Sequence, residues 1–393
     1  MRPYRRLGEL PRKRHMQFKK DGKLVFEELF GREGFSGPSS LIYHRSMPEG
    51  ARDVTEGPPD MSTPEHEQVH EHAHLKGYEL QPDGDLVTGR QWLLVNDDIR
   101  IGLALPLRAQ EMLYVNGSAD EVLFVHEGAG VLRSQFGRVP FGRHDYVVIP
   151  RGTIYRIDLD DPAQSRVLVL EVTGFVDSPE RYRARNGQLT EMAPYSERDF
   201  RGPEELELGE SAVEVWLKRA NHVSRYVLDH HPWDVIGWDG TVYPVAFNIH
   251  DFEPRAGRFH VPPPIHQTFQ AHNLVICSFA PRKLDWDPDA VMLPYHHSNL
   301  DSDEVLYYVE GNYAARRGVR SASFTHHPGG LPHGPQPGAL EASLDRPRET
   351  DELAVMVDTF RPLHRTTVAR RIFDKEYPFS WHTGGVAGTT SIA

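Results

Sequence analysis

Residues 295–335 read YHHSNLDSDEVLYYVEGNYAARRGVRSASFTHHPGGLPHGP and contain two patterns with defined spacing. The first is H-x-N, four residues, E, six residues and G, and it runs from His297 through Glu304 to Gly311. The second is P-x-G-x-x-H and ends at His333. Alternate side chains of a strand face the same way. A histidine and a glutamate on adjacent strands of a hairpin, with a histidine from a later strand, are therefore expected to point into one barrel interior.

These residue types favour a metal centre. Two imidazoles and one carboxylate leave about three open positions on an octahedral ion, and this is the ligand set of non-heme Fe(II) oxygenases. The spacing predicts that Fe(II) is held by His297, Glu304 and His333. His296 is the alternative to His297. Only His297 fits the spacing, and adjacent residues of a strand point to opposite faces.

The same spacings recur earlier in the chain, which indicates an internal repeat. Glu121 is followed after six residues by a glycine, and residues 150–155 read PRGTIY, the pattern P-x-G-x-x-Y. Alignment of the two halves places Tyr114, Asn116, Glu121 and Tyr155 at the positions of the site residues. Only the glutamate is a ligand of the expected kind. We therefore expect the first half to bind no metal and to serve as a structural or subunit-contact domain.

From residue 90 onward, short apolar runs such as QWLLV, EVLFV, DYVVI and SRVLVLEV alternate with Gly, Pro and Asp. This pattern of short apolar runs, together with 31 prolines and 33 glycines, predicts an all-β protein built from sandwiches or barrels. The expected organisation is an N-terminal arm and loop region (1–89), a β domain with the degenerate copy of the repeat (90–177), a connector with one amphipathic strand (178–233), a metal-binding β domain (234–370) and a tail (371–393).

Composition excludes several classes of protein. The 393 residues include a single cysteine, Cys277, so neither an intrachain disulfide nor a cysteine-rich metal site is possible, and a reducing cytoplasm is expected. No apolar run is long enough for a transmembrane helix. The net charge of −12 argues against a nucleic-acid binder. The basic residues within 1–20 are expected to lie on acidic surface of this chain or of a neighbouring subunit.

The stretch 48–75 is rich in Pro, Glu and His, and this composition is typical of a surface loop. His66, His70 and His74 share i, i+4 spacing and could form a metal clip. A solvated loop is the favoured interpretation, because no apolar framework surrounds these histidines.

The two spaced patterns resemble the motifs of the cupin superfamily, whose fold is a double-sheet jelly roll, and the repeat implies a bicupin. The second half is more specifically similar to the homogentisate 1,2-dioxygenase family, in YHHSN…SDE (295–304), GNYAARRG (311–318), HPGGLPHGP (327–335) and DVIGWDGTVYPVAFNIHDF (234–252). This resemblance implies opening of the homogentisate ring with O2 to give maleylacetoacetate, in aromatic amino-acid catabolism. It also implies Fe(II) as cofactor and trimers that pair into hexamers.

The resemblance also implies roles for individual residues. His297, Glu304 and His333 fall on the iron ligands, and His333 lies next to the substrate. His327 falls on a histidine that contacts substrate oxygen or bound O2. Tyr313 falls on a tyrosine that helps to hold substrate. The acid/base histidine matches His260 best, with His266 as the alternative. Imidazole suits that role because it titrates near neutral pH.

Some features depart from the family pattern. One extra residue lies between Asn299 and Glu304, Asn299 replaces a second histidine of the cupin motif, and the stretch 318–327 is short. Arg316 and Arg317 could assist in binding the substrate carboxylate. The alternatives are a related bicupin that acts on gentisate or another hydroxylated aromatic acid, a Mn or Zn isomerase or hydrolase, and a non-catalytic bicupin binding protein.

Overall fold

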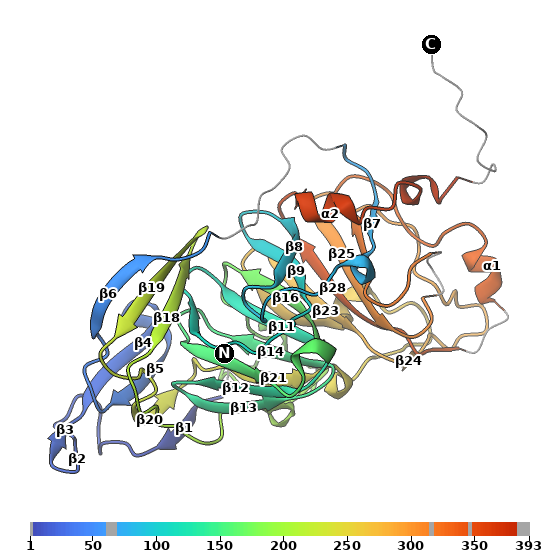
Figure 1. The fold of residues 1–393 in the computed structure, drawn as a ribbon. Helices are drawn as coiled ribbons and strands as arrows, with labels where there is room; N and C mark the ends of the chain where they lie inside the picture. Colours follow the sequence, from blue (N-terminus) through green and yellow to red (C-terminus); the bar gives the residue numbers. More distant parts are fainter. Residues whose placement is uncertain (1–2, 60–68, 314–317, 345–347, 383–393) are drawn as a thin grey trace.

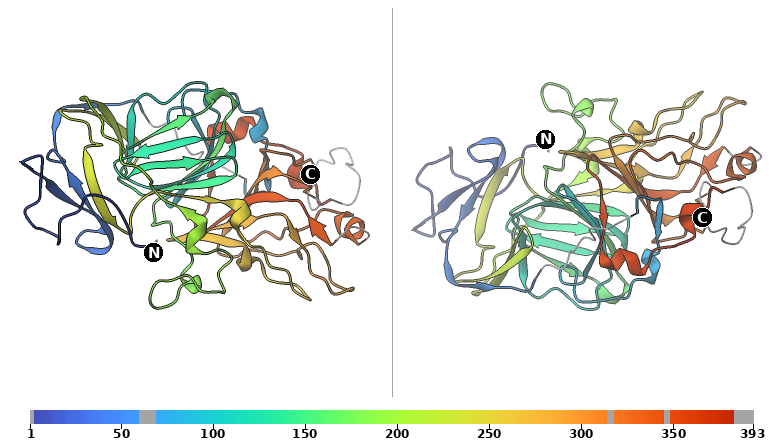
Figure 2. Two further views of the ribbon diagram at one scale, coloured as in Figure 1. Left: turned by 90° about the horizontal axis from the view of Figure 1, so that it is seen from below. Right: turned by 90° about the horizontal axis from the view of Figure 1, so that it is seen from above.

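The structure, a computed structural model, describes residues 3–59, 69–313, 318–344 and 348–382. Regular structure in these residues is almost entirely β, as predicted, and the sheets follow one another along the molecule from the N-terminal sheet to the second cupin (Figures 1 and 2). The α-helices are α1 (Ala339–Ser343) and α2 (Thr367–Arg371). Within the described part of the chain, no helix is long and apolar enough to span a bilayer.

Two sheets form the first cupin. The eight-stranded sheet contains, in spatial order, β17 (Phe200–Arg201), β21 (Val245–Asn248), β14 (Asp145–Ile149), β11 (Asp120–Glu127), β16 (Arg166–Val172), β9 (Ile99–Ala104), β8 (Arg90–Val95) and β29 (His364–Arg365). The seven-stranded sheet contains β13 (Gly137–Phe141), β12 (Gly130–Ser134), β15 (Tyr155–Leu159), β10 (Leu113–Asn116), β18 (Glu214–Arg219), β19 (His222–Leu228) and β6 (Ala51–Glu56). A shared apolar core contains residues of both sheets.

The second cupin is built on one six-stranded sheet. Its spatial order is β22 (Gln267–Ala271), β23 (Leu274–Phe279), β28 (Leu353–Thr359), β25 (Asp303–Glu310), β26 (Phe324–His327) and β7 (Ala73–Leu75). A separate pair joins β24 (Arg282–Lys283) to β27 (Glu349–Thr350). One face of the six-stranded sheet shares an apolar core with the eight-stranded sheet, and this core contains Val122 and Phe124 of β11 with Val305 and Tyr307 of β25.

The eight-stranded sheet is covered on both faces, and its sequence explains why it can be. In β16 (RVLVLEV), Val167 and Val169 belong to the interior of the first cupin, whereas Leu168 and Leu170 belong to the core shared with the second cupin. Alternate residues of a strand point to opposite faces. A continuous apolar run therefore fits a central strand that is buried on both sides.

The N-terminal region is more regular than the expected arm and loop. A four-stranded sheet contains β1 (Arg5–Gly8), β20 (Val235–Gly240), β5 (Ser36–His44) and β4 (Phe26–Glu33), and β2 (Lys19–Lys20) pairs with β3 (Lys23–Leu24). The basic arm thus contributes an edge strand, β1, to this sheet. The pairing of β5 with β20 joins segments about 200 residues apart, so local sequence patterns do not reveal it.

Two other expectations differ from the structure. The stretch 48–75 is only partly a loop, because β6 extends the seven-stranded sheet and β7 forms the edge of the six-stranded sheet. The connector 178–233 contains the β18–β19 pair, rather than one strand, and β18 runs parallel to β10 of the first cupin. The partners of β6 and β7, and the β10 strand beside β18, lie far away in the sequence, whereas β19 follows β18 directly in a hairpin.

Candidate metal centre and its cavity

Alternate residues on the strands of the six-stranded sheet face either the core between the cupins or a cavity. In β25, Val305 and Tyr307 face the core between the cupins, whereas Glu304, Leu306 and Tyr308 border a cavity. The neighbouring strands follow the same alternation, with Val275, Cys277 and Phe279 of β23 and Met356 and Asp358 of β28 at the cavity. The register pairs Glu304 with Asp358 and Leu306 with Met356. The period of two therefore places the glutamate of the spaced motif on the cavity wall.

This cavity has a volume of about 780 Å³, within the range of small-molecule sites. Its wall is largely apolar, and several polar side chains converge on it. Among the predicted site residues, His260, His297, Glu304 and Tyr313 border the cavity. Arg181 and Arg282 add positive charge to the same wall.

The three predicted ligands lie together. His297 and His333 form a backbone bridge with reciprocal N–H···O distances of 2.9 and 2.8 Å. His297 Nε2 lies 3.5 Å from Glu304 Oε2, and His333 Nε2 lies 3.4 Å from Glu304 Oε1. One possible ligand atom from each of the three residues lies within 4.8 Å of the others. His296, the alternative to His297, is exposed and is not part of this group.

The electrostatics of the group fit a cation. His333 Nε2 is buried and makes no hydrogen bond among the described residues, so its nitrogen is available as a ligand. Burial alone would raise the pKa of Glu304, but the imidazoles of His297, His327 and His333 outweigh it and hold that pKa well below its usual range. The carboxylate is therefore ionised. Two imidazoles and one carboxylate suit a divalent transition metal.

His327 lies behind the ligand group. Its side chain is 0% exposed, and its Nδ1 lies 2.8 Å from Glu304 Oε1. Its ring stacks on His333 with 4.3 Å between centroids, and its Nε2 lies 3.4 Å from the Tyr377 hydroxyl. Because His327 does not border the cavity, this arrangement favours orientation of Glu304 over the predicted contact with substrate.

The structure distinguishes the two acid/base candidates. His260 is exposed, borders the cavity and packs against Tyr295, with 4.7 Å between ring centroids. His266 is buried beside Phe279 and does not border the cavity. Burial lowers the pKa of His266 to about 3, so this imidazole stays neutral at working pH. Only His260 is placed where it could exchange a proton with a bound molecule.

Tyr313 also borders the cavity, and its buried hydroxyl makes no hydrogen bond among the described residues. Burial raises the pKa of Tyr313, so the phenol remains protonated and can donate. Arg316 and Arg317 lie outside the described residues. Sequence reasoning missed Arg181 and Arg282, because nothing in their local sequence links them to the motifs.

Asp358 is a further residue that the sequence did not indicate. It is half-buried on β28 opposite Glu304, and its buried Oδ1 has no hydrogen-bond partner among the described residues. Burial, followed by the charge of Glu304, raises the pKa of Asp358 to about 8. Its position on the cavity face follows from the strand register, which is known only once β28 is paired with β25.

The histidine-rich stretch contributes to the back of the site. His72 Nε2 lies 3.2 Å from the Pro332 carbonyl oxygen, and the His72 ring packs near His327, His333 and Trp381. His74 is buried in β7 and contacts Ser323 and Asp374. His70 is exposed, and His66 lies outside the described residues. The favoured interpretation of this stretch as a solvated loop is therefore wrong for His72 and His74.

In the first cupin, an arginine lies where the repeat would place a metal. The Arg90 guanidinium forms ion pairs with Glu121 and with Glu171, the latter at 3.2 Å, and donates to the Tyr155 hydroxyl at 3.0 Å. Lys218 Nζ also donates to Glu171, at 2.8 Å. Two buried cations therefore balance two buried carboxylates. This pairing gives a physical reason for the predicted absence of a metal, which stays a prediction.

Known proteins are similar to this chain, one of them over almost its whole length. The family described as "Homogentisate 1,2-dioxygenase N-terminal" matches residues 99–249. A protein of Saccharolobus solfataricus described as "Putative dioxygenase" is 37% identical over 383 residues, which cover 97% of this chain and 99% of that protein. The chain belongs to the homogentisate 1,2-dioxygenase family. It is thus a bicupin related to oxidoreductases of the dioxygenase type.

The chain is less similar to the relatives that are described as homogentisate 1,2-dioxygenases. The homogentisate 1,2-dioxygenase of Bradyrhizobium diazoefficiens is 26% identical over 271 residues, which cover 65% of this chain and 59% of that enzyme. The chain thus matches about three fifths of the length of this relative. A crystal structure described as a "putative dioxygenase" from Nostoc punctiforme has a TM-score of 0.36 and 12% identity, and covers 78% of this chain and 87% of that chain.

Proposed function

We propose that this protein is an Fe(II)-dependent ring-cleaving dioxygenase that converts homogentisate and O2 to maleylacetoacetate. The observation that supports this function best is the grouping of His297, Glu304 and His333, in which His297 and Glu304 line a cavity of about 780 Å³ and His333 lies outside its lining. Membership of the homogentisate 1,2-dioxygenase family supports a dioxygenase reaction and makes homogentisate the candidate substrate. The proposed location is the cytoplasm.

The cavity has features that suit a hydroxylated aromatic acid. Apolar side chains such as Val275, Phe279 and Leu306 can pack on an aromatic ring. Arg181 and Arg282 on the same wall supply positive charge for a carboxylate, although Arg282 also pairs with Glu352 at 3.4 Å. The Tyr313 hydroxyl is available to donate a hydrogen bond to the same ligand.

His297, Glu304 and His333 would hold the iron. When bound, Fe(II) supplies a Lewis acid that lowers the pKa of a coordinated phenol and offers open positions for a ring hydroxyl and O2. His260 would take the proton of the distal hydroxyl on its imidazole, because it reaches the cavity from the exposed side. His327 would act through Glu304, by keeping the carboxylate oriented.

Oxygen uptake by the anaerobically iron-loaded protein tests this proposal. Homogentisate is expected to consume one O2 per molecule and to produce an ultraviolet-absorbing open-chain product. Gentisate and another hydroxylated aromatic acid are the comparison substrates. If only gentisate is turned over, the related-bicupin alternative is correct, and if no acid supports oxygen uptake, the dioxygenase proposal fails.

The quaternary structure is also a proposal. The family resemblance implies trimers or hexamers, with substrate and O2 as the small-molecule partners and with neither nucleic acid nor membrane. Light scattering of the purified protein measures the mass directly, and a monomeric mass would contradict this part of the proposal.

A further inference from the structure

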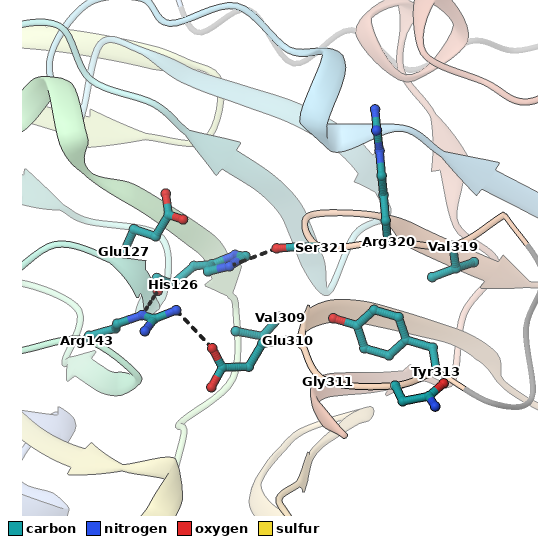
Figure 3. Close-up of a pocket in the computed structure, with 11 residues that line it drawn as sticks. His126, Glu127, Arg143, Val309, Glu310, Gly311, Tyr313, Val319, Arg320 and Ser321 are labelled. Atoms are coloured by element: carbon teal, nitrogen blue, oxygen red, sulfur yellow. Dashed lines mark hydrogen bonds and ion pairs between the residues drawn. The ribbon is translucent and has the colours of Figure 1, made fainter. Parts of the chain in front are cut away.

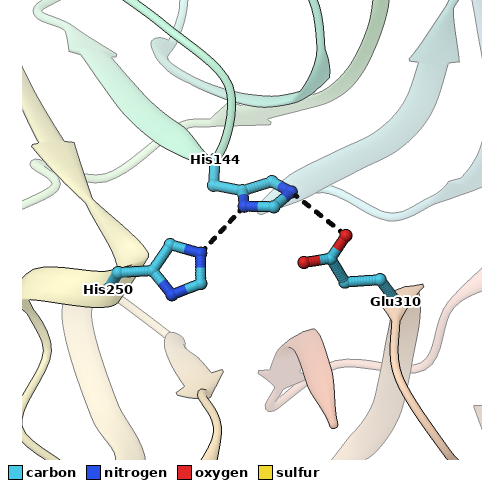
Figure 4. Close-up of side chains that lie close together, drawn as sticks. All are labelled: His144, His250 and Glu310. Atoms are coloured by element: carbon cyan, nitrogen blue, oxygen red, sulfur yellow. Dashed lines mark hydrogen bonds and ion pairs between the residues drawn. The ribbon is translucent and has the colours of Figure 1, made fainter. Parts of the chain in front are cut away.

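A second histidine–carboxylate cluster lies where the two cupins meet (Figure 4). His144 precedes β14, His250 lies in the 3-10 turn Ile249–Asp251 after β21, and Glu310 is the last residue of β25. Strands β14 and β21 are paired, and Ile249 N donates to the His144 carbonyl oxygen at 3.0 Å. The sheet register therefore holds the two histidines side by side, and the second cupin supplies the carboxylate.

The separations within this cluster are those of potential ligands. His144 Nδ1 lies 2.9 Å from His250 Nε2, and His144 Nε2 lies 3.9 Å from Glu310 Oε2. One ligand atom from each residue lies within 4.8 Å of the others. An imidazole gives only one nitrogen to an ion, so His144 would bind through Nε2, which faces Glu310, and the exposed His250 ring, now in contact with His144 Nδ1, would turn to reach the same ion.

We propose that His144, His250 and Glu310 form a second divalent-metal site, distinct from the cavity site, which binds zinc or a similar borderline ion and joins the two cupins. Two imidazoles and one carboxylate match the ligand preferences of Zn²⁺. The ion would carry a structural role, because two ligands come from the first cupin and one from the second.

The surroundings of His144 suit it to bind a metal ion. It is buried, and its Nε2 makes no hydrogen bond among the described residues, so a buried nitrogen faces Glu310 without a partner of hydrogen-bond geometry.

The other two ligands leave access for the ion. His250 is exposed and Glu310 is half-buried, so water can fill the remaining coordination positions. Glu310 also borders an open cavity of about 570 Å³, where the Arg143 guanidinium lies 2.9 Å from its carboxylate (Figure 3). Arg143 therefore competes with a metal for Glu310, and rotation of this partly exposed carboxylate away from Arg143 would complete the site.

A zinc titration tests this inference independently of the proposed function. The starting protein carries His297→Ala and His333→Ala, which remove the cavity site, and is freed of metal with a chelator. Calorimetry with zinc chloride is expected to show one bound equivalent. Addition of His250→Gln, a change at an exposed position, is expected to abolish this equivalent. His272→Gln changes an exposed histidine outside the cluster and should leave it in place.

Thermal unfolding gives a second readout. A ligand that binds only the folded state raises the Tm as its concentration rises, so zinc should raise the Tm of the starting variant and of the His272→Gln control but not of the His250→Gln variant. If the starting variant binds no zinc, or if His250→Gln retains the bound equivalent, the second site is disproved. Failure of ring cleavage would leave this result unaffected.

Discussion

At the scale of single residues, Glu304 illustrates how burial and charge are balanced. Its carboxylate is buried on β25, where an isolated charge would be costly. Three imidazoles surround it at 2.8 to 3.5 Å. Two of them, His297 and His333, are proposed metal ligands, whereas the third, His327, holds the carboxylate from behind. This separation of roles leads to different expectations for each histidine.

Replacement of His327 by Gln should weaken metal binding without removing a ligand. Loss of an outer partner of a ligating carboxylate typically costs about 10- to 100-fold in metal affinity or activity. Competition between the protein and a chelator for Fe(II) measures the affinity. His326→Gln is the matched control, because His326 is an adjacent buried histidine whose Nε2 lies 3.0 Å from Asp303 instead. Equal affinities in the two variants would contradict the orienting role of His327.

Replacement of Arg282 by Gln should raise the KM for homogentisate. A hydrogen bond to a charged group contributes about 1.5–3 kcal/mol, which corresponds to roughly 10- to 100-fold in binding. Steady-state oxygen uptake gives KM and kcat separately, and kcat should change much less than KM. Arg258→Gln serves as the control, since Arg258 is exposed, pairs with Asp287 and does not border the cavity. An unchanged KM would exclude Arg282 from carboxylate binding.

At the scale of the elements, the spacing of residues in the sequence was sufficient to predict which three side chains group together. It was not sufficient to predict the residues that surround them. The six residues between Glu304 and Gly311 lie on one strand, and the P-x-G-x-x-H motif follows the next strand of the hairpin, so their positions depend on short-range geometry. Asp358, Arg282 and His72 reach the same site from distant segments. Their contributions depend on which strands pair, and pairing between distant segments leaves little trace in a single sequence.

The N-terminal sheet shows the same dependence and yields a pH prediction. His44 of β5 contacts Asp234, next to β20, at 2.7 Å and Glu28 of β4 at 2.9 Å, and thus links three strands. Burial lowers the pKa of His44, but the two carboxylates outweigh this effect and raise it from 6.5 to about 9. The protonated form is favoured by folding, with a contribution of about 3 kcal/mol.

Because the folded-state pKa lies above the unfolded value, this contribution is fully present below pH 6.5 and is lost as the pH rises through about 9. The difference in the free energy of unfolding between the wild type and His44→Gln should therefore shrink by about 3 kcal/mol between these pH values. Urea denaturation at a series of pH values measures it. A pH-independent difference would show that His44 is not protonated in the folded state.

At the scale of the whole molecule, one apolar core joins the two cupins. Residues of β11 and β16 in the first cupin and of β23, β25 and β28 in the second belong to the same buried cluster. Polar contacts cross the same boundary, such as Tyr146 hydroxyl to Ser278 Oγ at 2.8 Å. Separation of the halves would expose this surface, so neither half is expected to remain folded alone.

The shared core predicts that the two cupins unfold together. Calorimetry of the metal-free protein should give one cooperative transition, because exposure of a shared apolar face destabilises both halves at once. Two well-separated transitions, each with about half of the total enthalpy, would contradict this coupling.

The metal content of a Glu304 variant tests the central claim most directly. Wild-type protein and Glu304→Ala are loaded with Fe(II) under anaerobic conditions, desalted and analysed for iron, and oxygen uptake with homogentisate is then recorded. Glu349→Ala, which removes an exposed carboxylate at the same cavity, is the control. We predict that Glu304→Ala loses one equivalent of iron and all activity, whereas Glu349→Ala retains both. Full iron content and full activity in Glu304→Ala would contradict the proposed metal centre.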